Sequence, residues 1–176
     1  LYSSAASDVY KRQLMNTYRL PQEVEDVLEG ALVAILTVVN EKNEPVSHPM
    51  LPLYDRDRGL LYFTSSILFS KKLEYIKKNP RVSVLISHRE YVNSDKYHAI
   101  EIKGDARVFD QDLSREWQKL LPLWRKKEPY IDTYLKQRFA LPLFWERAII
   151  EVRPRKVRVW RDGDLEKEPE YYIMGG

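Results

Sequence analysis

The sequence predicts an α+β fold in which an antiparallel, barrel-like β-sheet is flanked by peripheral helices. Three observations support this prediction. Short segments rich in β-branched and aliphatic residues recur between turn signals. Most of the intervening connections are short, which favours hairpins. The helical patterns cluster between strands instead of alternating with them regularly. We expect about seven strands and three or four helices, and the length of 176 residues suits one domain.

The first predicted elements are a short helix and a hairpin. Residues 21–29 begin with a proline, carry acids in the first turns, and are followed by Gly30 as a stop signal. The aliphatic run at 31–39 predicts a buried strand. A polar connection at 40–45 leads to a return strand at 46–55, whose two prolines make it an irregular or edge strand.

The middle of the chain predicts three strands and one helix. After a tight turn, 60–65 forms a strand, and 70–78 forms a helix ended by Asn-Pro. The alternating segment at 81–87 predicts a half-buried strand. A long strand follows at 97–110, in which Gly104 predicts a bulge or a close approach of backbones.

The last third predicts two helices and then two strands. Residues 111–127 carry apolar side chains at helical spacing, and Pro122 is expected to bend or interrupt that helix. A second short helix is expected at 129–139, and two strands at 144–154 and 156–160. The aromatic side chains of these helices are expected to pack in the core or at a subunit interface, because a base-stacking platform needs exposed aromatics in a basic groove.

Composition excludes several classes of protein. A net charge of +3 does not suit a strongly basic nucleic-acid binder, and the absence of cysteine excludes disulfides, thiolate metal sites and thiol catalysis. No run has the roughly 18 apolar residues of a membrane span, and we expect a cytoplasmic protein.

The chain is expected to divide into a leader, one domain and a tail. Residues 1–14 have no helical or strand period and are expected to be a non-native leader. The domain is expected at 15–163, and a loosely held tail at 164–176.

Two lysines begin the helix at 70–78, where their charge opposes the helix dipole. Lys71 and Lys72 lie in its first turn, at the positive end. A bound anion would reverse that penalty. The free N–H groups of the turn, the hydroxyls of Thr64, Ser65 and Ser70, and the two ammonium groups could together hold a phosphate. The alternative is a pair of solvated surface lysines, and the two readings are about equally supported by these helix-terminus rules.

The motif around these lysines resembles a known family. The stretch LYFTSS…SKKLEYIKKNPRVSVLI (61–86) resembles the signature of the pyridoxamine 5′-phosphate oxidase-like, flavin-binding split-barrel superfamily. The hairpin at 31–54 and the segment RPRKVRVWRDG (153–163) are similar to other parts of that family. The resemblance implies an antiparallel split β-barrel of six to seven strands with Greek-key connections. It also implies an FMN cofactor and a homodimer with the cofactor at the subunit interface.

The resemblance and the helix-terminus argument together predict the cofactor contacts. The aromatic-Thr pair lies near the ribityl phosphate, the basic pair binds the phosphate, one strand follows the ring, and a tryptophan contacts the flavin. The residues at these positions are His48, Pro49, Met50, Leu51, Phe63, Thr64, Ser65, Ser70, Lys71, Lys72 and Trp160. No catalytic residue and no metal-ligand spacing is recognisable in the sequence.

Two departures argue against vitamin B6 oxidation. The true oxidase has Arg and Lys at the ends of the ring-side strand, where this chain has His48 and Leu53. The Arg-x-His-Asp-Arg segment that should follow Trp160 is replaced by GDLEKEPEYYI. We therefore expect an FMN-dependent oxidoreductase acting on an unidentified small molecule. The alternatives are a reductase that uses the deazaflavin coenzyme F-420, a non-catalytic flavin- or haem-binding protein, and a cofactor-free interaction module.

Overall fold

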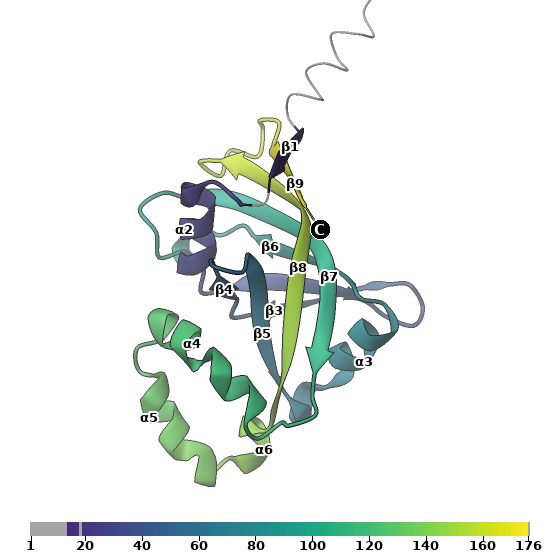
Figure 1. Ribbon diagram of the computed structural model, residues 1–176, viewed down its shortest axis with the longest axis vertical. Coiled ribbons are helices and arrows are strands. Elements are labelled where there is room, and N and C mark those ends of the chain that lie inside the picture. The colour runs from purple at the N-terminus through teal and green to yellow at the C-terminus, as the bar shows by residue number, and fades with distance from the viewer. Residues whose placement is uncertain (1–13, 18, 176) are drawn as a thin grey trace, which may run out of the picture.

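A computed structural model of the chain describes residues 14–17 and 19–175. Most of the predicted leader, residues 1–13, lies outside the described residues, and Leu14 begins the first strand. The described strands form one curled sheet (Figure 1). They are β1 (Leu14–Thr17), β2 (Ala34–Val39), β3 (Pro45–Met50), β4 (Leu53–Asp55), β5 (Leu60–Ser66), β6 (Arg81–Ile86), β7 (His98–Phe109), β8 (Arg147–Arg161) and β9 (Glu170–Met174).

The topology confirms the predicted antiparallel α+β barrel. The sheet order is β1-β9-β8-β7-β6-β2-β3, and β5 pairs with both β8 and β4. All of these pairs are antiparallel except β1 with β9. The edge position predicted for the proline-containing segment is also confirmed, because β3 pairs only with β2 among the described strands. Its neighbour β4 leaves that edge and pairs with β5.

Short helices pack around the sheet in three places: α2, α3, and the group α4–α6 (Figure 1). The α-helices are α2 (Gln22–Gly30), α3 (Lys71–Lys78), α4 (Leu121–Lys127), α5 (Ile131–Leu135) and α6 (Pro142–Trp145), and the 3-10 turns are η1 (Ile67–Phe69), η2 (Arg89–Tyr91), η3 (Glu116–Leu120) and η4 (Lys136–Phe139). None of the helices in the described part of the chain is both long and apolar enough to cross a membrane.

The prediction of a helix at 111–127 is wrong about where the helix begins and correct that the helix is interrupted. The helical part begins as the 3-10 turn η3 at Glu116, because the side chain of Asp112 accepts the backbone N–H of Arg115 and stabilises a turn there. It changes into α4 at Leu121, and Pro122 lies in the first turn of α4, where its missing N–H costs no hydrogen bond.

Two strands predicted at 144–154 and 156–160 are in fact one strand, β8. The register with β7 shifts between Lys103 and Gly104, so that Arg155 is the extra residue of a bulge and the ladder continues on both sides. The predicted close approach at Gly104 is confirmed, because a Cβ there would lie 2.4 Å from the carbonyl oxygen of Arg153. The first three residues of the predicted strand belong to α6 and the turn after it, since Pro142 starts a helix.

The tail expected to be loose contains β9. This strand pairs with the C-terminal half of β8, whereas β5 pairs with the N-terminal half. Arg161 fixes the junction by bonding to Glu170 at 2.7 Å and to the hydroxyl of Tyr172 at 3.1 Å. A buried tyrosine and a charge-assisted hydrogen bond therefore hold a segment whose acidic composition suggested a solvated tail.

The core is divided into two clusters. The larger fills the barrel and is closed by α2 and α3. The second lies under α4–α6 and includes Trp117, Trp124 and Trp145, which confirms core packing for these predicted aromatics. By contrast, Tyr130, Tyr134 and Phe139 are exposed. The second cluster positions α4 and α6 beside the end of β5, where the candidate site lies.

Candidate functional site

The helix that begins at the lysine pair has an open end. The helix α3 starts at Lys71, directly after the turn η1, and its N-cap residue Ser70 makes no side-chain capping hydrogen bond. Only the backbone carbonyl of Ser70 is used, by Leu73 at 2.8 Å and by Glu74 at 3.4 Å. Nothing within the first turn therefore uses the Ser70 hydroxyl, which is available to a ligand.

The side chain of Lys72 is turned inward from this helix end. It is only 7% exposed. Its Nζ donates to Ser65 Oγ at 3.1 Å and to the carbonyl oxygen of Phe69 at 2.8 Å. Burial lowers the pKa of Lys72, and the charge of Arg147 lowers it further. The solvated-lysine alternative is therefore wrong for Lys72, whereas Lys71 is exposed at the rim.

Arg147 brings a second cation to the same place from β8. Its Nε donates to Thr64 Oγ1 at 3.0 Å, and its Nη2 donates to the Thr64 carbonyl at 3.2 Å. The guanidinium carbon lies 5.0 Å from the ring centre of Phe144 and 5.5 Å from that of Trp124. Burial lowers the pKa of Arg147 to about 10.

These two cations have no acid to balance them. Within residues 19–175, neither Lys72 nor Arg147 forms an ion pair with a carboxylate. Each mainly donates to neutral oxygens, and the proximity of one charge disfavours the other. Burying like charges without a counterion is costly, so an arrangement of this kind is favourable chiefly when an anion binds.

His48 faces the cations from the edge strand β3. Its Nε2 is buried and has no hydrogen-bond partner among the described residues. The pKa of His48 is lowered by burial and by the charge of Lys72, so the neutral ring is favoured. A ligand beside β3 would therefore meet an imidazole nitrogen that has no competing bond.

A groove of about 750 Å³ joins these groups. Nine of the eleven predicted cofactor residues line it: His48, Pro49, Met50, Leu51, Thr64, Ser65, Ser70, Lys71 and Lys72. The other two do not. Phe63 points the other way on β5 and is fully buried in the barrel core. Thr64 pairs with Ile149 on β8, and Trp160 lies eleven residues farther along the same strand. At about 3.3 Å per residue, this separation is roughly 36 Å of strand, so Trp160 lies far from the groove.

Leu53 and Ser66, which belong to the segments that resemble the family's ring-side strand and phosphate motif, also line the groove. The sequence analysis did not assign a site role to the remaining lining residues, which are Leu68, Phe69, Trp124, Phe144 and Arg147. Arg147 is the most informative of them, because it stands 83 positions from Thr64 along the chain and reaches it through the pairing of β8 with β5. The only local sign was an arginine directly before the apolar run at 148–150.

The sequence matches the model of a known protein family. The family model described as pyridoxamine 5′-phosphate oxidase matches residues 20–161. This chain belongs to the pyridoxamine 5′-phosphate oxidase family. The match spans β2 to β8 and thus both walls of the groove. No curated protein matches the chain.

Solved structures share the fold of this family member at low identity. The general stress protein 26 of Bacillus anthracis is 20% identical, with 87% of this chain and 97% of that chain covered and a TM-score of 0.54. An F420 reductase is 22% identical, with 78% and 98% covered and a TM-score of 0.54. HutZ of Vibrio cholerae, described as a haem storage protein, is 14% identical, with 77% and 90% covered and a TM-score of 0.54. These likenesses support the split-barrel fold.

Proposed function

We propose that this protein is an oxidoreductase that binds FMN in the groove between β3, the end of β5 and α3, and acts on a small molecule. The observation that carries the proposal is the buried pair Lys72 and Arg147, which has no acid partner in the described part of the chain. A phosphate monoester is a suitable counterion, because it offers acceptor oxygens and up to two negative charges.

The chain's own residues fit each part of such a cofactor. Lys72, Arg147 and the open end of α3 would hold the phosphate, and the hydroxyls of Thr64 and Ser65 lie beside them. His48 would offer its free nitrogen to the ring or to a substrate. Leu51 and neighbouring apolar side chains would exclude water from one side of the ring. Bound FMN would supply the hydride or electron transfer, which no side chain of the protein can supply.

A deazaflavin is the second candidate cofactor. The F420 reductase with the same fold supports it, and the phosphodiester of such a coenzyme also carries a negative charge for Lys72 and Arg147. Titration of the purified protein with FMN and separately with coenzyme F-420, followed by fluorescence, separates the two. We expect saturable binding of FMN and weaker binding of F-420. If F-420 bound more tightly than FMN, the deazaflavin would replace FMN as the proposed cofactor. If neither molecule bound, the proposal would be refuted.

A visible spectrum of the protein as purified tests the remaining alternatives. A bound flavin and a bound haem absorb at different visible wavelengths, and haem gives an intense Soret band that a flavin lacks. The structural likeness to a haem storage protein makes haem a concrete alternative. His48 is the histidine that lines the groove, so a Soret band that is lost in His48→Ala would favour haem over FMN.

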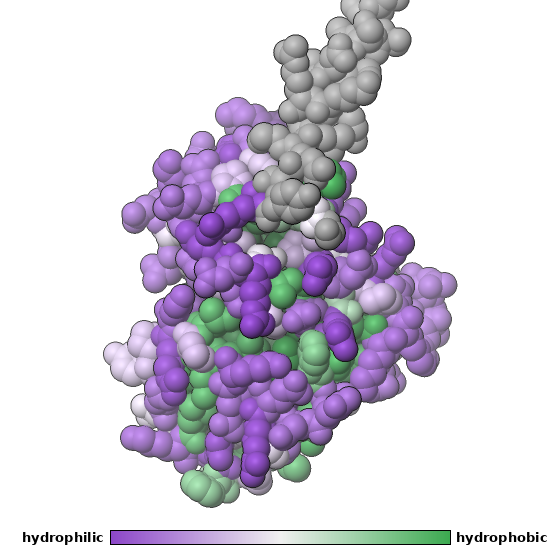
Figure 2. Space-filling model, viewed as in Figure 1, coloured by the Kyte–Doolittle hydropathy of each residue, from purple (hydrophilic) through white to green (hydrophobic). Residues whose placement is uncertain are grey.

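We further propose that the active form is a cytoplasmic homodimer in which Trp160 of one chain completes the groove of the other. Trp160 is too far along β8 to reach the groove of its own chain. Exposed apolar side chains surround the mouth of the groove: Leu68 and Phe69 on η1, and Leu141, Leu143 and Phe144 around α6. Figure 2 shows apolar surface gathered over the part of the molecule where α4–α6 lie.

Mixing two variants tests the shared site. In Lys72→Met the groove is defective, and in Trp160→Ala the donated tryptophan is missing. In a mixed dimer, one groove carries both defects and the other carries none. We expect refolding an equal mixture to restore FMN binding in mixed dimers at one site each. If Trp160 acted within its own chain, no mixed dimer would contain an intact site, and the mixture would bind no better than the variants alone.

A further inference from the structure

The helix α5 and the turn η4 form an outer edge of the molecule. In Figure 1, α5 lies on the far side of α4 from the sheet, and it packs on α4 and continues into η4. Ile131 is buried against the second core cluster, and Leu135 is partly buried beside it. Residues 136–139 are exposed throughout. This edge therefore presents most of its side chains to the surroundings of the protein.

Three aromatic side chains are exposed along this edge. Phe139 is 94% exposed, Tyr130 is 77% exposed and Tyr134 is 54% exposed. None of the three lines the cofactor groove, and none lines the second groove between α2, the 89–96 loop and α4. Their apolar area is not buried within the chain, so it contributes little to stability. Exposed aromatics that gather in this way are typical of a contact surface.

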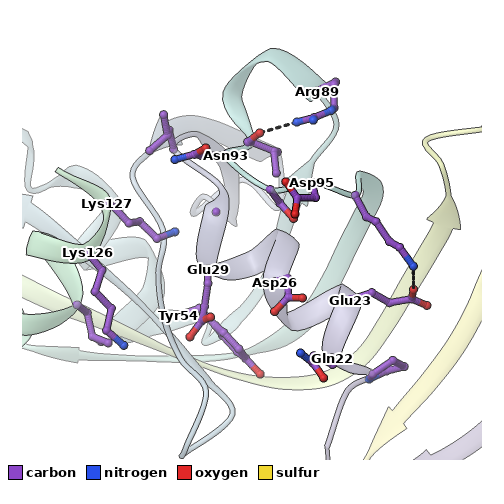
Figure 3. Close-up of a pocket in the computed structure, with 17 residues that line it drawn as sticks. Gln22, Glu23, Asp26, Glu29, Tyr54, Arg89, Asn93, Asp95, Lys126 and Lys127 are labelled. Atoms are coloured by element: carbon purple, nitrogen blue, oxygen red, sulfur yellow. Dashed lines mark hydrogen bonds and ion pairs between the residues drawn. The ribbon is translucent and has the colours of Figure 1, made fainter. Parts of the chain in front are cut away.

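Three cations on the same edge have no partner. Within residues 19–175, Lys126, Lys136 and Arg138 form no hydrogen bond and no ion pair through their side chains. The neighbouring Lys127 differs, because its Nζ donates to two carbonyl oxygens at the end of α2. Figure 3 shows Lys127 reaching toward the end of α2, whereas Lys126 points another way. The three cations are therefore available to an external anion.

The two acids of this region do not balance these cations. Glu128 accepts the indole N–H of Trp124 at 2.5 Å, and Asp132 accepts two N–H groups of Arg125 at 2.9 and 2.8 Å. Residues 121–145 contain five basic and two acidic side chains, and this excess equals the net charge of +3 of the whole chain. The positive charge of the protein is thus concentrated at this edge, and the remainder is neutral in sum.

The local geometry places charge beside apolar rings. Side chains three residues apart in a 3-10 helix lie on the same side, so Lys136 and Phe139 share a face of η4. Tyr130 and Tyr134 are four residues apart at the start of α5 and within it, so they also lie on one side. Rings next to basic groups suit a bilayer interface, where rings enter the headgroup region and cations meet lipid phosphates.

We infer that the edge formed by α5 and η4 docks on the surface of an anionic lipid bilayer. Charge favours this partner over a second copy of the chain, because a symmetric contact would bring like charges together. The shape favours it over single-stranded nucleic acid, because the rings lie on a projecting edge and not in a groove that follows a strand (Figure 1). The inference does not depend on the proposed cofactor, since none of these residues lines the cofactor groove.

Co-sedimentation with vesicles tests this inference. The full chain without cofactor is mixed with vesicles of phosphatidylcholine alone, or with vesicles that also contain about 30% phosphatidylglycerol. We expect binding to the anionic vesicles to be at least about tenfold tighter, and to weaken at about 0.5 M salt. Equal binding to the two kinds of vesicle, or no binding to the anionic vesicles, would overturn the inference.

An apolar substitution and its matched control locate the contact. Phe139→Ser should weaken binding to anionic vesicles about tenfold, because its ring no longer enters the interface. Leu165→Ser removes a side chain that is 65% exposed on the turn between β8 and β9, and it should leave binding unchanged. Equal losses in the two variants would overturn the inference, since the contact would not lie at η4.

A charge substitution is controlled in the same way. One basic residue near an anionic surface contributes about fivefold in affinity, so the double variant Lys136→Gln/Arg138→Gln should bind about 25-fold more weakly. Lys42→Gln/Lys103→Gln changes the net charge equally at exposed positions of the β2–β3 hairpin and of β7. It should weaken binding less than about threefold. Equal losses in both double variants would mean that overall charge, and not this edge, attracts the bilayer, and would overturn the inference.

Two measurements on the same variants test other occupants of this edge. Sedimentation velocity should give the same oligomeric state for Phe139→Ser as for the parent. A change would assign the edge to a contact between subunits and overturn the inference. Fluorescence anisotropy with a labelled single-stranded oligonucleotide should give no binding that depends on Lys136 and Arg138. Binding that is lost in their double variant would assign the edge to nucleic acid and would also overturn the inference.

Discussion

Replacing Lys72 by methionine should weaken FMN binding without harming the fold. Lys72 Nζ donates to Ser65 Oγ and to the Phe69 carbonyl, but these acceptors do not depend on it, because Ser65 Oγ also donates to Phe69 O at 3.3 Å. Methionine fills a similar volume and removes a buried charge that Arg147 repels. The substitution therefore removes a group that contributes to FMN binding and contributes little to the stability of the protein without FMN.

The expected magnitudes follow from these contacts. A hydrogen bond to a charged group contributes about 1.5–3 kcal/mol, which corresponds to an increase in the Kd for FMN of about 10- to 150-fold. Without ligand, relief of the uncompensated charge offsets the lost hydrogen bonds. The free energy of unfolding of the apoprotein should fall by less than about 1 kcal/mol, or should rise.

Two measurements on the same samples check this prediction. Fluorescence titration gives the Kd for FMN, and urea denaturation of the apoprotein gives the free energy of unfolding. Lys77→Met is the matched control, because Lys77 lies in the last turn of the same helix and is bonded to Asp110 at 2.6 Å. It should leave the Kd unchanged. An unchanged Kd in Lys72→Met, together with a loss of about 3 kcal/mol or more in stability, would mean that Lys72 is structural and would refute the reasoning.

Three further predictions concern neighbouring features. Arg147→Met should also raise the Kd for FMN about 10- to 150-fold, and equal affinity in a titration would remove the guanidinium from the phosphate site. Because burial lowers the pKa of His48, the unfolded chain binds more protons below about pH 6.5, so stability falls on acidification. Urea denaturation should show that His48→Gln loses less stability than the parent between about pH 7.5 and about pH 5.5, and equal losses would contradict this. Gly104→Ala should cost about 1–3 kcal/mol because its Cβ would meet Arg153 O, and an unchanged midpoint of thermal unfolding would count against the close approach.

The local features of the chain were predictable because their causes are local. The helix dipole acts within one turn, so the lysine pair at the start of α3 marked a candidate anion site from the sequence alone, and that site stays a prediction. The alternation of apolar residues located β6 and β7, and the prolines located the edge strand β3. Glycine at position 104 marked the bulge for the same reason, since only a missing side chain permits that contact.

The predictions that failed depended on distant segments. A break at Arg155 looked like the end of a strand, but the continuous partner β7 carries the ladder past it. The acidic tail looked solvated, but β8 offered an unpaired edge, and Arg161 neutralises Glu170 there. These outcomes rest on strand pairing, which no window of local sequence encodes.

The sequence by itself determined the fold class, most of the groove lining and one of its two buried cations, because periodicity, capping and the motif at 61–86 are written in neighbouring residues. Only the tertiary structure decided that Arg147 stands beside Lys72, that Phe63 turns into the core, and that Trp160 lies far along β8. The reason is physical: the register of β5 with β8 sets which charges meet, and a charge without a counterion can be recognised only when all of its neighbours are known.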